Sequence, residues 1–294
     1  MKINEIQVKS IMTKSSLPLG GYSVNPYVGC PFECKYCYAS FMKRFTGHKE
    51  PWGKFLDVKY WPEIKNPEKY SGKQVLIGSV TDGYNPYEKK YKRTRKLLEE
   101  LETSNAKITI CTKSDLVKRD LDVLRKMKDV TVSFSINTID ELFRRDMDKA
   151  SSIECRLTAM KEVYEAGIRT VCFVSPIFPG ITDVVEIIEK AKDFCDFVWM
   201  ENLNLRGGYR SVILNYIKTK YTDLFPLYEQ IYNKKDRSYW KELESQMRAY
   251  AKEHDFPYFD NFLPGIRSKP GKPAVINYLY HEEIRGSENT GIRK

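Results

Sequence analysis

Three cysteines lie within eight residues near the start of the chain. They belong to the segment NPYVGCPFECKYCY, residues 25–38, in which Cys30, Cys34 and Cys37 have the spacing C-x3-C-x2-C. Soft thiolates on a short loop favour zinc or an iron–sulfur cluster. A structural zinc site takes four ligands, whereas only three are local here and His48 is the nearest further candidate. Three thiolates on a four-iron cubane would instead leave one iron open to a small molecule.

An iron–sulfur cluster with one open iron is suited to bind and cleave S-adenosylmethionine (SAM). The open iron holds the amino and carboxylate groups of the methionine part, and the reduced cluster gives one electron to the sulfonium. Homolysis then yields methionine and a 5′-deoxyadenosyl radical. Because the cofactor carries the difficult chemistry, the protein has to bind it, orient it and exclude water.

The spacing of the cysteines, with the aromatic Tyr36 just before the third, resembles the radical SAM signature. This resemblance implies a 4Fe-4S cluster held by Cys30, Cys34 and Cys37, and SAM as the second cofactor. It also implies a partner, which is an external one-electron reductant of the flavodoxin or ferredoxin type. The alternative that the residues leave open is a non-catalytic iron–sulfur or zinc protein.

Four further motifs follow the cysteines in order. They are GSVTDGY at 78–84, TKSD at 112–115, FSINT at 134–138 and ENLN at 201–204. As an ordered set they resemble the spore photoproduct lyase-like family of radical SAM proteins, whose members are often labelled DNA repair photolyases. The resemblance covers roughly residues 20 to 210. It implies a lyase or another radical-based modification that begins with removal of a hydrogen atom from a substrate.

The resemblance also implies which residues bind SAM. Lys113 would reach a SAM oxygen, Arg156 would lie near the SAM carboxylate, and Ser175 would meet the adenine through its backbone. Glu201 would bind the SAM ribose or the substrate, the alternative being a surface carboxylate at a strand end. The full set of expected cofactor-binding residues is Tyr36, Tyr38, Thr81, Lys113, Ser135, Arg156, Ser175 and Glu201.

The alternation of side chains along a strand gives an argument that does not depend on the resemblance. Ser79 and Thr81 share one face of an expected strand, and so do Cys111 and Lys113. Small polar groups on successive strands favour a polar lumen near the strand ends, where active sites of parallel barrels lie. Each hydroxyl taken alone is more often a satisfied core group. A buried Lys113 would need an anion, and the SAM carboxylate would serve.

The candidates for hydrogen transfer are Ser79, Cys111 and Tyr84. In spore photoproduct lyase a cysteine at the position of Ser79 returns a hydrogen atom to the product radical, and a serine O–H bond is too strong for that role. Repair of spore photoproduct by that route is therefore not expected. Cys111 offers a thiol from another strand, unless it is only a small buried hydrophobe. Tyr84 is a candidate radical relay.

The elements that position these residues alternate between short β-rich runs and helices. Strands are predicted at 75–79, 107–112, 130–136, 169–175 and 197–201, and helices at 90–101, 115–127, 153–166 and 183–194. Repeats of this length indicate a parallel sheet with outer helices. With one strand before Cys30, about six units predict an α/β fold, a partial (β/α)6 TIM-like barrel rather than a complete barrel of eight.

Three parts are expected along the chain. Residues 1–24 are predicted to be an irregular N-terminal lead-in because the stretch from 15 to 21 is rich in loop formers, and residues 25–210 form the radical SAM barrel. Residues 211–294 form a C-terminal extension, a candidate substrate-binding part. It is predicted to be helical up to residue 251, then a loop or β-hairpin, and to end in a frayed polar tail.

The net charge of the chain is +10, with basic runs at 89–96 and 267–272. Such a chain attracts polyanions, and its twenty tyrosines suit base stacking, so a nucleic acid or nucleotide is the expected substrate. A peptide or small metabolite is the alternative, in which case the charge is an ordinary solvated surface. No apolar run approaches the ~20 residues of a membrane span, and no secretory signal is recognisable, so a cytoplasmic location is expected.

Overall fold

A parallel sheet forms the centre of the computed structural model, which describes residues 1–15, 21–261, 266 and 268–279. Its nine strands lie in the order β11-β12-β10-β9-β8-β7-β6-β3-β2. Each neighbouring pair from β3 to β10 is parallel, which confirms the partial barrel. These six strands are β3 (Tyr22–Val24), β6 (Gln74–Ile77), β7 (Lys107–Thr112), β8 (Asp129–Ser135), β9 (Arg169–Ile177) and β10 (Phe197–Asn202).

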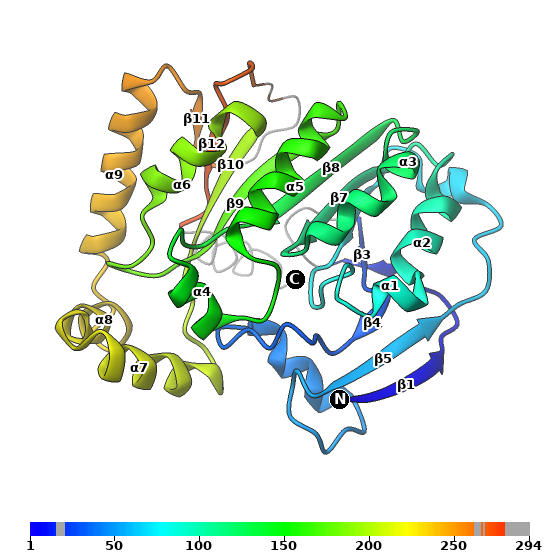
Figure 1. Cartoon of the computed structure of the whole chain (residues 1–294), viewed down its shortest axis with the longest axis horizontal. Coiled ribbons are helices and arrows are strands. Elements are labelled where there is room, and N and C mark those ends of the chain that lie inside the picture. The colour runs from blue at the N-terminus through cyan, green and yellow to red at the C-terminus, as the bar shows by residue number, and fades with distance from the viewer. Residues whose placement is uncertain (16–20, 262–265, 267, 280–294) are drawn as a thin grey trace, which may run out of the picture.

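Helices cover the outer face of this sheet (Figure 1). Apolar side chains of helices and strands merge into one core, to which Leu97, Ile110 and Ile188 belong. The outer helices are α2 (Arg93–Leu101), α3 (Leu121–Leu124), α5 (Ile153–Glu165) and α6 (Val184–Ala191). Burial of one stripe of each helix against the sheet supplies most of the driving force for this arrangement.

Short polar side chains begin several helices. Ser152 accepts a hydrogen bond from the backbone N–H of Cys155 at the start of α5. Asp183 accepts from the N–H of Glu186 at α6, and Asp140 accepts from the N–H groups at the start of α4 (Glu141–Met147), a helix that was not predicted from the sequence. Each such cap satisfies an N–H group that has no partner inside the helix.

Two of the predicted helices are interrupted. The helix expected at 90–101 is divided into α1 (Glu88–Tyr91) and α2 by Lys92, whose φ of 49° is left-handed. The helix expected at 115–127 starts as a 3-10 turn, η3 (Asp115–Asp120), before α3. Further 3-10 turns are η1 (Tyr38–Phe45), η2 (Pro67–Tyr70), η4 (Lys192–Phe194) and η5 (Thr222–Leu224).

The N-terminal part differs from the irregular lead-in that was predicted. It contains β1 (Lys2–Gln7), β2 (Thr13–Lys14), which pairs antiparallel with β3, and β3 itself. Strand β1 pairs in parallel with β5 (Phe55–Tyr60), and β5 pairs antiparallel with β4 (Tyr27–Val28). These three strands form a second sheet, which is held by contacts between residues far apart in the sequence, such as Lys2 with Phe55 and Tyr27 with Val58, that no local pattern reveals.

The C-terminal extension is helical, as predicted. It comprises α7 (Tyr209–Lys220), α8 (Phe225–Tyr232) and α9 (Ser238–Glu253). The β part is more than the predicted hairpin. Lys269 and Lys272 make a single antiparallel bridge, but β11 (Tyr258–Phe259) and β12 (Ala274–Asn277) pair in parallel, and β12 adds to the barrel sheet beside β10. The buried apolar residues of β12 complete the edge of the barrel core.

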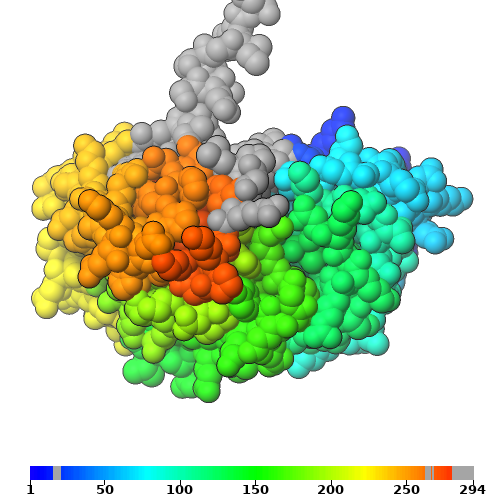
Figure 2. Space-filling model, turned by 90° about the horizontal axis from the view of Figure 1, so that it is seen from above, coloured from blue at the N-terminus to red at the C-terminus, as the bar shows by residue number. Residues whose placement is uncertain are grey.

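Two features predicted from sequence fall wholly or largely outside the described residues, namely the loop-forming stretch at 15–21 and the polar tail at 282–294. The basic run at 267–272 is described except for its first residue. Viewed from above, the C-terminal helices (yellow to orange) and the N-terminal segment (blue to cyan) lie on opposite sides of the molecule (Figure 2). Within the described ranges, none of the helices has both the length and the apolar character that a membrane crossing requires.

Candidate active site

The cysteine loop follows directly from β4 in the second sheet. Gly29, just before the first cysteine, has a φ of 84°, and a Cβ there would lie 2.3 Å from the carbonyl oxygen of Phe55. Only glycine fits this position. Two backbone hydrogen bonds then fold the loop, from Glu33 N–H to the Cys30 carbonyl and from Cys37 N–H to the Cys34 carbonyl.

The three thiols are close enough to influence one another electrostatically. Burial raises the pKa of Cys30 to about 12 and that of Cys34 well above its usual range. Binding to iron would therefore displace protons from the thiols. Among the described residues, no three or more His, Cys, Asp or Glu side chains are grouped around a position for a single metal ion. Thiolates of one cubane bind different irons, so the donor set fits a cluster.

The fourth ligand that zinc would need is not supplied by His48. Its Nε2 lies 2.8 Å from Asp57 and its Nδ1 lies 3.3 Å from Glu50. The ring also stacks on Phe55 at 3.9 Å between centroids. Both nitrogens therefore have carboxylate partners, and the residue belongs to the packing of the second sheet beside the cysteine loop.

The cysteine loop is anchored to the segment between α4 and α5. Lys149 N–H donates to the Phe32 carbonyl at 2.7 Å, and Lys35 N–H donates to the Met147 carbonyl at 2.9 Å. Glu33 binds both Lys54 and Lys149 through its carboxylate. Two separate parts of the chain thus fix the loop on its outer side.

Tyr36 lies on the inner side of the loop, in a buried polar cluster. Its hydroxyl donates to Asp148 Oδ2 at 2.9 Å. Arg156 is fully buried and binds the other oxygen of Asp148 at 2.8 Å, while its remaining nitrogens reach the carbonyls of Ser135 and Ser151. The guanidinium is therefore held by the protein on all sides, and its visible role is to orient Asp148 beneath Tyr36.

Lys113 follows β7 and faces this cluster. Its Nζ lies 5.8 Å from the centre of the Tyr36 ring. Burial lowers the pKa of Lys113, but nearby Cys34 and Asp148 outweigh it, and the pKa is raised. Within the described part of the chain the ammonium makes no hydrogen bond or ion pair closer than 4.0 Å. An inward-facing amine without a direct partner fits the anion that the sequence analysis expected there.

The loop after β6 packs against the start of the cysteine loop. Thr81 donates to the Gly29 carbonyl at 2.6 Å, and the Ser79 hydroxyl lies 2.5 Å from that of Ser23. Asn25 reaches the same hydroxyl at 3.0 Å. Strand β6 ends at Ile77, so Ser79 and Thr81 do not lie on a strand and the argument from alternating faces does not apply to them.

Asp82 in this loop was not among the residues predicted individually, although it stands in the GSVTDGY motif. Burial raises the pKa of its carboxyl. It accepts hydrogen bonds from the N–H groups of Lys113 and Tyr84 and from the Thr112 hydroxyl, at 2.7 to 2.9 Å. Asp82 therefore ties the ends of β6 and β7 together and sets the position of Lys113.

A second polar group forms across β7, β8, β9 and β10. Ser175 donates to Glu201 Oε2 at 2.5 Å between neighbouring strands. Cys111 lies beside the Ser133 hydroxyl and close enough to Glu201 to sense its charge, and burial raises the pKa of its thiol to about 12. The alternation predicted for these strands thus does bring small polar groups together in the lumen.

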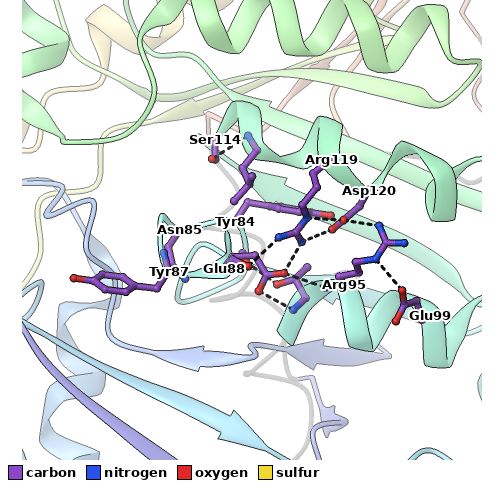
Figure 3. Close-up of polar contacts among 12 residues, drawn as sticks. Tyr84, Asn85, Tyr87, Glu88, Arg95, Glu99, Ser114, Arg119 and Asp120 are labelled. Atoms are coloured by element: carbon purple, nitrogen blue, oxygen red, sulfur yellow. Dashed lines mark hydrogen bonds and ion pairs between the residues drawn. The ribbon is translucent and has the colours of Figure 1, made fainter. Parts of the chain in front are cut away.

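Tyr84 lies elsewhere. Its ring is fully buried next to Asp120 and Glu88, among the residues between the sheet and the outer helices. Figure 3 shows this network, in which Arg119 binds both Glu88 and Asp120. Only the Tyr84 backbone N–H contributes to the strand ends, through Asp82.

Asp148 is the important residue that sequence reasoning missed. Its partners Tyr36 and Arg156 stand 112 and 8 positions away in sequence. It lies in an irregular segment between two helices, and no spacing rule marks it. Its recognition required the tertiary structure.

Comparison with known proteins supports the fold and the family. A family model of the Radical SAM superfamily matches residues 24–196. The uncharacterized protein MJ0683 of Methanocaldococcus jannaschii is 36% identical over 236 residues, which are 80% of this chain and 88% of that protein. The uncharacterized protein ORF301 of Acidianus two-tailed virus is 33% identical over 64% of this chain and 68% of its own.

Solved structures of spore photoproduct lyase have a similar fold. A doubly substituted form with bound AdoMet and dinucleoside spore photoproduct has a TM-score of 0.61 and 18% identity, over 94% of this chain and 82% of that one. A singly substituted form has a TM-score of 0.55 and 18% identity, and the match covers 75% of this chain and 66% of the lyase chain. The cysteine loop and the six-strand barrel agree with the family match, and this chain belongs to the Radical SAM superfamily.

Proposed function

We propose that the chain is a radical SAM enzyme whose substrate is a nucleic acid or nucleotide. The observation that supports this substrate class is the exposure of aromatic rings in segment η1, which follows Cys37. Tyr38, Phe41 and Phe45 in this segment are 54%, 45% and 65% exposed. Large aromatic side chains are seldom exposed together without a partner.

Segment η1 combines exposed rings with positive charge. The Arg44 guanidinium lies 5.4 Å from the Phe41 ring centre and 4.6 Å from that of Phe45. The two rings stand edge to face at 6.5 Å, and η1 contains no acidic residue. Rings on which bases stack, next to cations that meet phosphates, are the features of a single-strand binding surface.

The supporting arrangement for SAM begins at the cysteine loop, where Cys30, Cys34 and Cys37 would hold the cluster. The bound cluster and SAM would together supply the 5′-deoxyadenosyl radical. In this proposal Lys113 binds the SAM carboxylate, because its ammonium faces the loop without a direct anionic partner. Arg156 acts through Asp148, which holds the Tyr36 ring under Lys113.

The remaining SAM contacts are assigned along the strand ends. Ser175 and Glu201 form a hydrogen-bonded pair suited to ribose and adenine, with Glu201 accepting from a ribose hydroxyl. Thr81, in the loop after β6, and Ser135, at the end of β8, are assigned to the methionine part. Tyr38, whose hydroxyl donates to the Ser79 carbonyl, links η1 to the loop after β6.

Among the three candidates for hydrogen transfer, the arrangement favours Cys111. Burial keeps its thiol protonated, since its pKa is raised to about 12. The S–H bond would break and a C–H bond would form on the product radical, and the resulting thiyl radical would regain one electron from the external reductant and one proton from water. Ser79 offers only a strong O–H bond, and the Tyr84 ring lies in the core between the sheet and the outer helices.

The test uses the full chain after anaerobic reconstitution of the cluster. With dithionite and SAM we expect 5′-deoxyadenosine to form, and deuterium from a labelled oligonucleotide to enter it. A labelled single-stranded DNA or RNA oligonucleotide should bind more weakly as salt is raised. Formation of 5′-deoxyadenosine with no oligonucleotide binding at low salt and no deuterium transfer from a labelled oligonucleotide or nucleotide would refute the substrate class and favour a peptide or metabolite.

The role of Cys111 has its own test. Cys111→Ala should leave 5′-deoxyadenosine formation intact and reduce the yield of reduced product at least about tenfold, because the intermediate radical loses its hydrogen donor. Cys172→Ala, at another buried cysteine on β9, is the matched control. Equal product yields from the two variants would remove Cys111 from the mechanism.

A further inference from the structure

A hollow of about 460 Å³ lies against the outer side of the cysteine loop. It is bordered by Phe32 from the loop, by residues that follow β6 and β7, and by the segment before α5. None of its lining residues belongs to the SAM-binding set described above. The hollow is therefore a separate feature that shares one wall with the cluster site.

That shared wall is apolar and thin. Phe32 and Ala150 line the hollow, and both pack with Cys30 in one buried group against which Cys34 also lies. A redox centre placed in the hollow would meet the cluster ligands across a single layer of side chains. Electron transfer becomes steeply slower with distance, so this is a short route from the surface to the cysteines.

The rim of the hollow is basic. Four cations line it, namely Lys89, Lys118, Arg119 and Lys149, against the single carboxylate of Asp115. Arg119 is engaged by Glu88 and Asp120, whereas Lys118 and Lys149 make only surface pairs.

Lys89 is exposed and has no ion-pair partner among the described residues. It opens the basic run at 89–96, whose Lys90 and Lys92 are exposed as well. The hollow thus presents a net positive edge to solvent, to which Lys89 contributes the first charge of the basic run.

We propose that an acidic one-electron donor protein, of the flavodoxin or ferredoxin type, docks on this hollow. Members of the superfamily need an electron from outside, and this inference rests on the proposed radical SAM activity. One electron leaves the reduced donor, which is oxidised by one equivalent, and reduces the cluster held by the cysteines by one equivalent. No atom is transferred.

A protein donor suits this hollow better than a nucleic acid does. The surface with exposed aromatic rings is η1, whereas Phe32, the one aromatic residue that lines the hollow, is buried to 3% exposure in the packing around Cys30. A basic rim around an apolar floor matches the acidic ring that surrounds a partly exposed redox centre. Complementary charge of this kind acts mainly on the rate of association and on its salt dependence.

The test compares two charge-reversed variants of the reconstituted full chain. Lys89→Glu with Lys118→Glu changes the rim, and Lys241→Glu with Lys252→Glu on α9 changes the net charge equally in the C-terminal extension. Binding to a purified bacterial flavodoxin is measured by calorimetry and stopped-flow at low and high salt. We expect the rim variant to associate at least about tenfold more slowly at low salt, and the control to match the wild type.

A second measurement separates docking from catalysis. With dithionite, the rim variant should form 5′-deoxyadenosine at the wild-type rate and hold the same iron content. With reduced flavodoxin its rate should fall in step with the weaker binding. If the rim variant kept the wild-type affinity for flavodoxin and the wild-type turnover with reduced flavodoxin, the proposed docking site would be wrong.

Two other outcomes are equally decisive. Absence of 5′-deoxyadenosine from the wild type with dithionite would refute the proposed function, whereas the binding comparison would still judge the docking site. Loss of oligonucleotide binding in the rim variant, with flavodoxin binding unchanged, would assign the hollow to nucleic acid and overturn the proposal.

Discussion

The two tyrosines that flank Cys37 belong to regions of opposite character. Tyr36 is 7% exposed and donates to the buried Asp148, whereas Tyr38 is 54% exposed and begins a segment of solvent-facing rings. On the inner side, hydrogen bonds fix Tyr36, Asp148 and Arg156 to one another. In segment η1, the outer region, the rings of Tyr38, Phe41 and Phe45 are exposed to solvent beside the guanidinium of Arg44.

This difference suits the two regions to different tasks. A buried network with satisfied hydrogen bonds is rigid and suits the positioning of a cofactor. An exposed aromatic and basic surface is free to meet a macromolecule. One short loop therefore joins a region built for precise binding to a region built for recognition, and each can be disturbed separately.

The largest effect should come from the loop that joins the two regions. Cys34→Ala should prevent assembly of the cluster, because two thiolates do not hold a cubane. The visible iron–sulfur absorbance of the reconstituted protein and its 5′-deoxyadenosine formation should both be lost. Cys155→Ala, at an exposed cysteine on α5, should keep both. A full iron content in the Cys34 variant would contradict the assignment of the loop.

The inner region should respond next. Asp148→Ala leaves the buried Arg156 without its anion and should lower the free energy of unfolding by about 3–5 kcal/mol. Tyr36→Phe removes one hydrogen bond and should cost only about 1 kcal/mol. Urea unfolding of each variant and of the double variant measures both effects. If Asp148→Ala lowered the free energy of unfolding by less than Tyr36→Phe does, the contrast between the two regions would be contradicted.

The outer region should change binding rather than stability. Phe41→Ala with Phe45→Ala should weaken oligonucleotide binding by about 1–3 kcal/mol for each base that stacks, with a change in stability of at most about 0.5 kcal/mol. Leu142→Ala, at a side chain that is 73% exposed on α4, is the control. A loss of stability as large as the loss of binding would show that η1 is part of the packed core.

The smallest effect should come from an ion pair at the surface. Arg95 lowers the pKa of Asp122 from 3.8 to about 2. A carboxyl whose pKa is lower in the folded state contributes stability above its unfolded pKa and loses it as pH falls through the folded value. Asp122→Asn should therefore flatten the pH dependence of stability only between about pH 4 and pH 2, as thermal unfolding would reveal. A difference that persists unchanged below pH 2 would contradict it.

Much of the fold could be read from the sequence because its signals are local. The cysteine spacing, the strand β7 at 107–112 and the helix α5, expected at 153–166, are all properties of a few neighbouring residues. Parallel pairing followed from the regular alternation of strands and helices. The strand before the GSVTDGY motif was predicted at 75–79, but β6 ends at Ile77 because Gly78 has a φ of 91°.

The sequence by itself determined the cysteine triad, the order of the barrel strands and the residue types available at their ends. Only the tertiary structure decided that Arg156 orients Asp148, that Tyr84 faces the outer core, and that Phe32 separates the cysteines from a basic hollow. The physical reason is the range of the contacts. A motif is fixed by neighbours along the chain, whereas a buried charge pair or a surface hollow exists only once distant segments have packed.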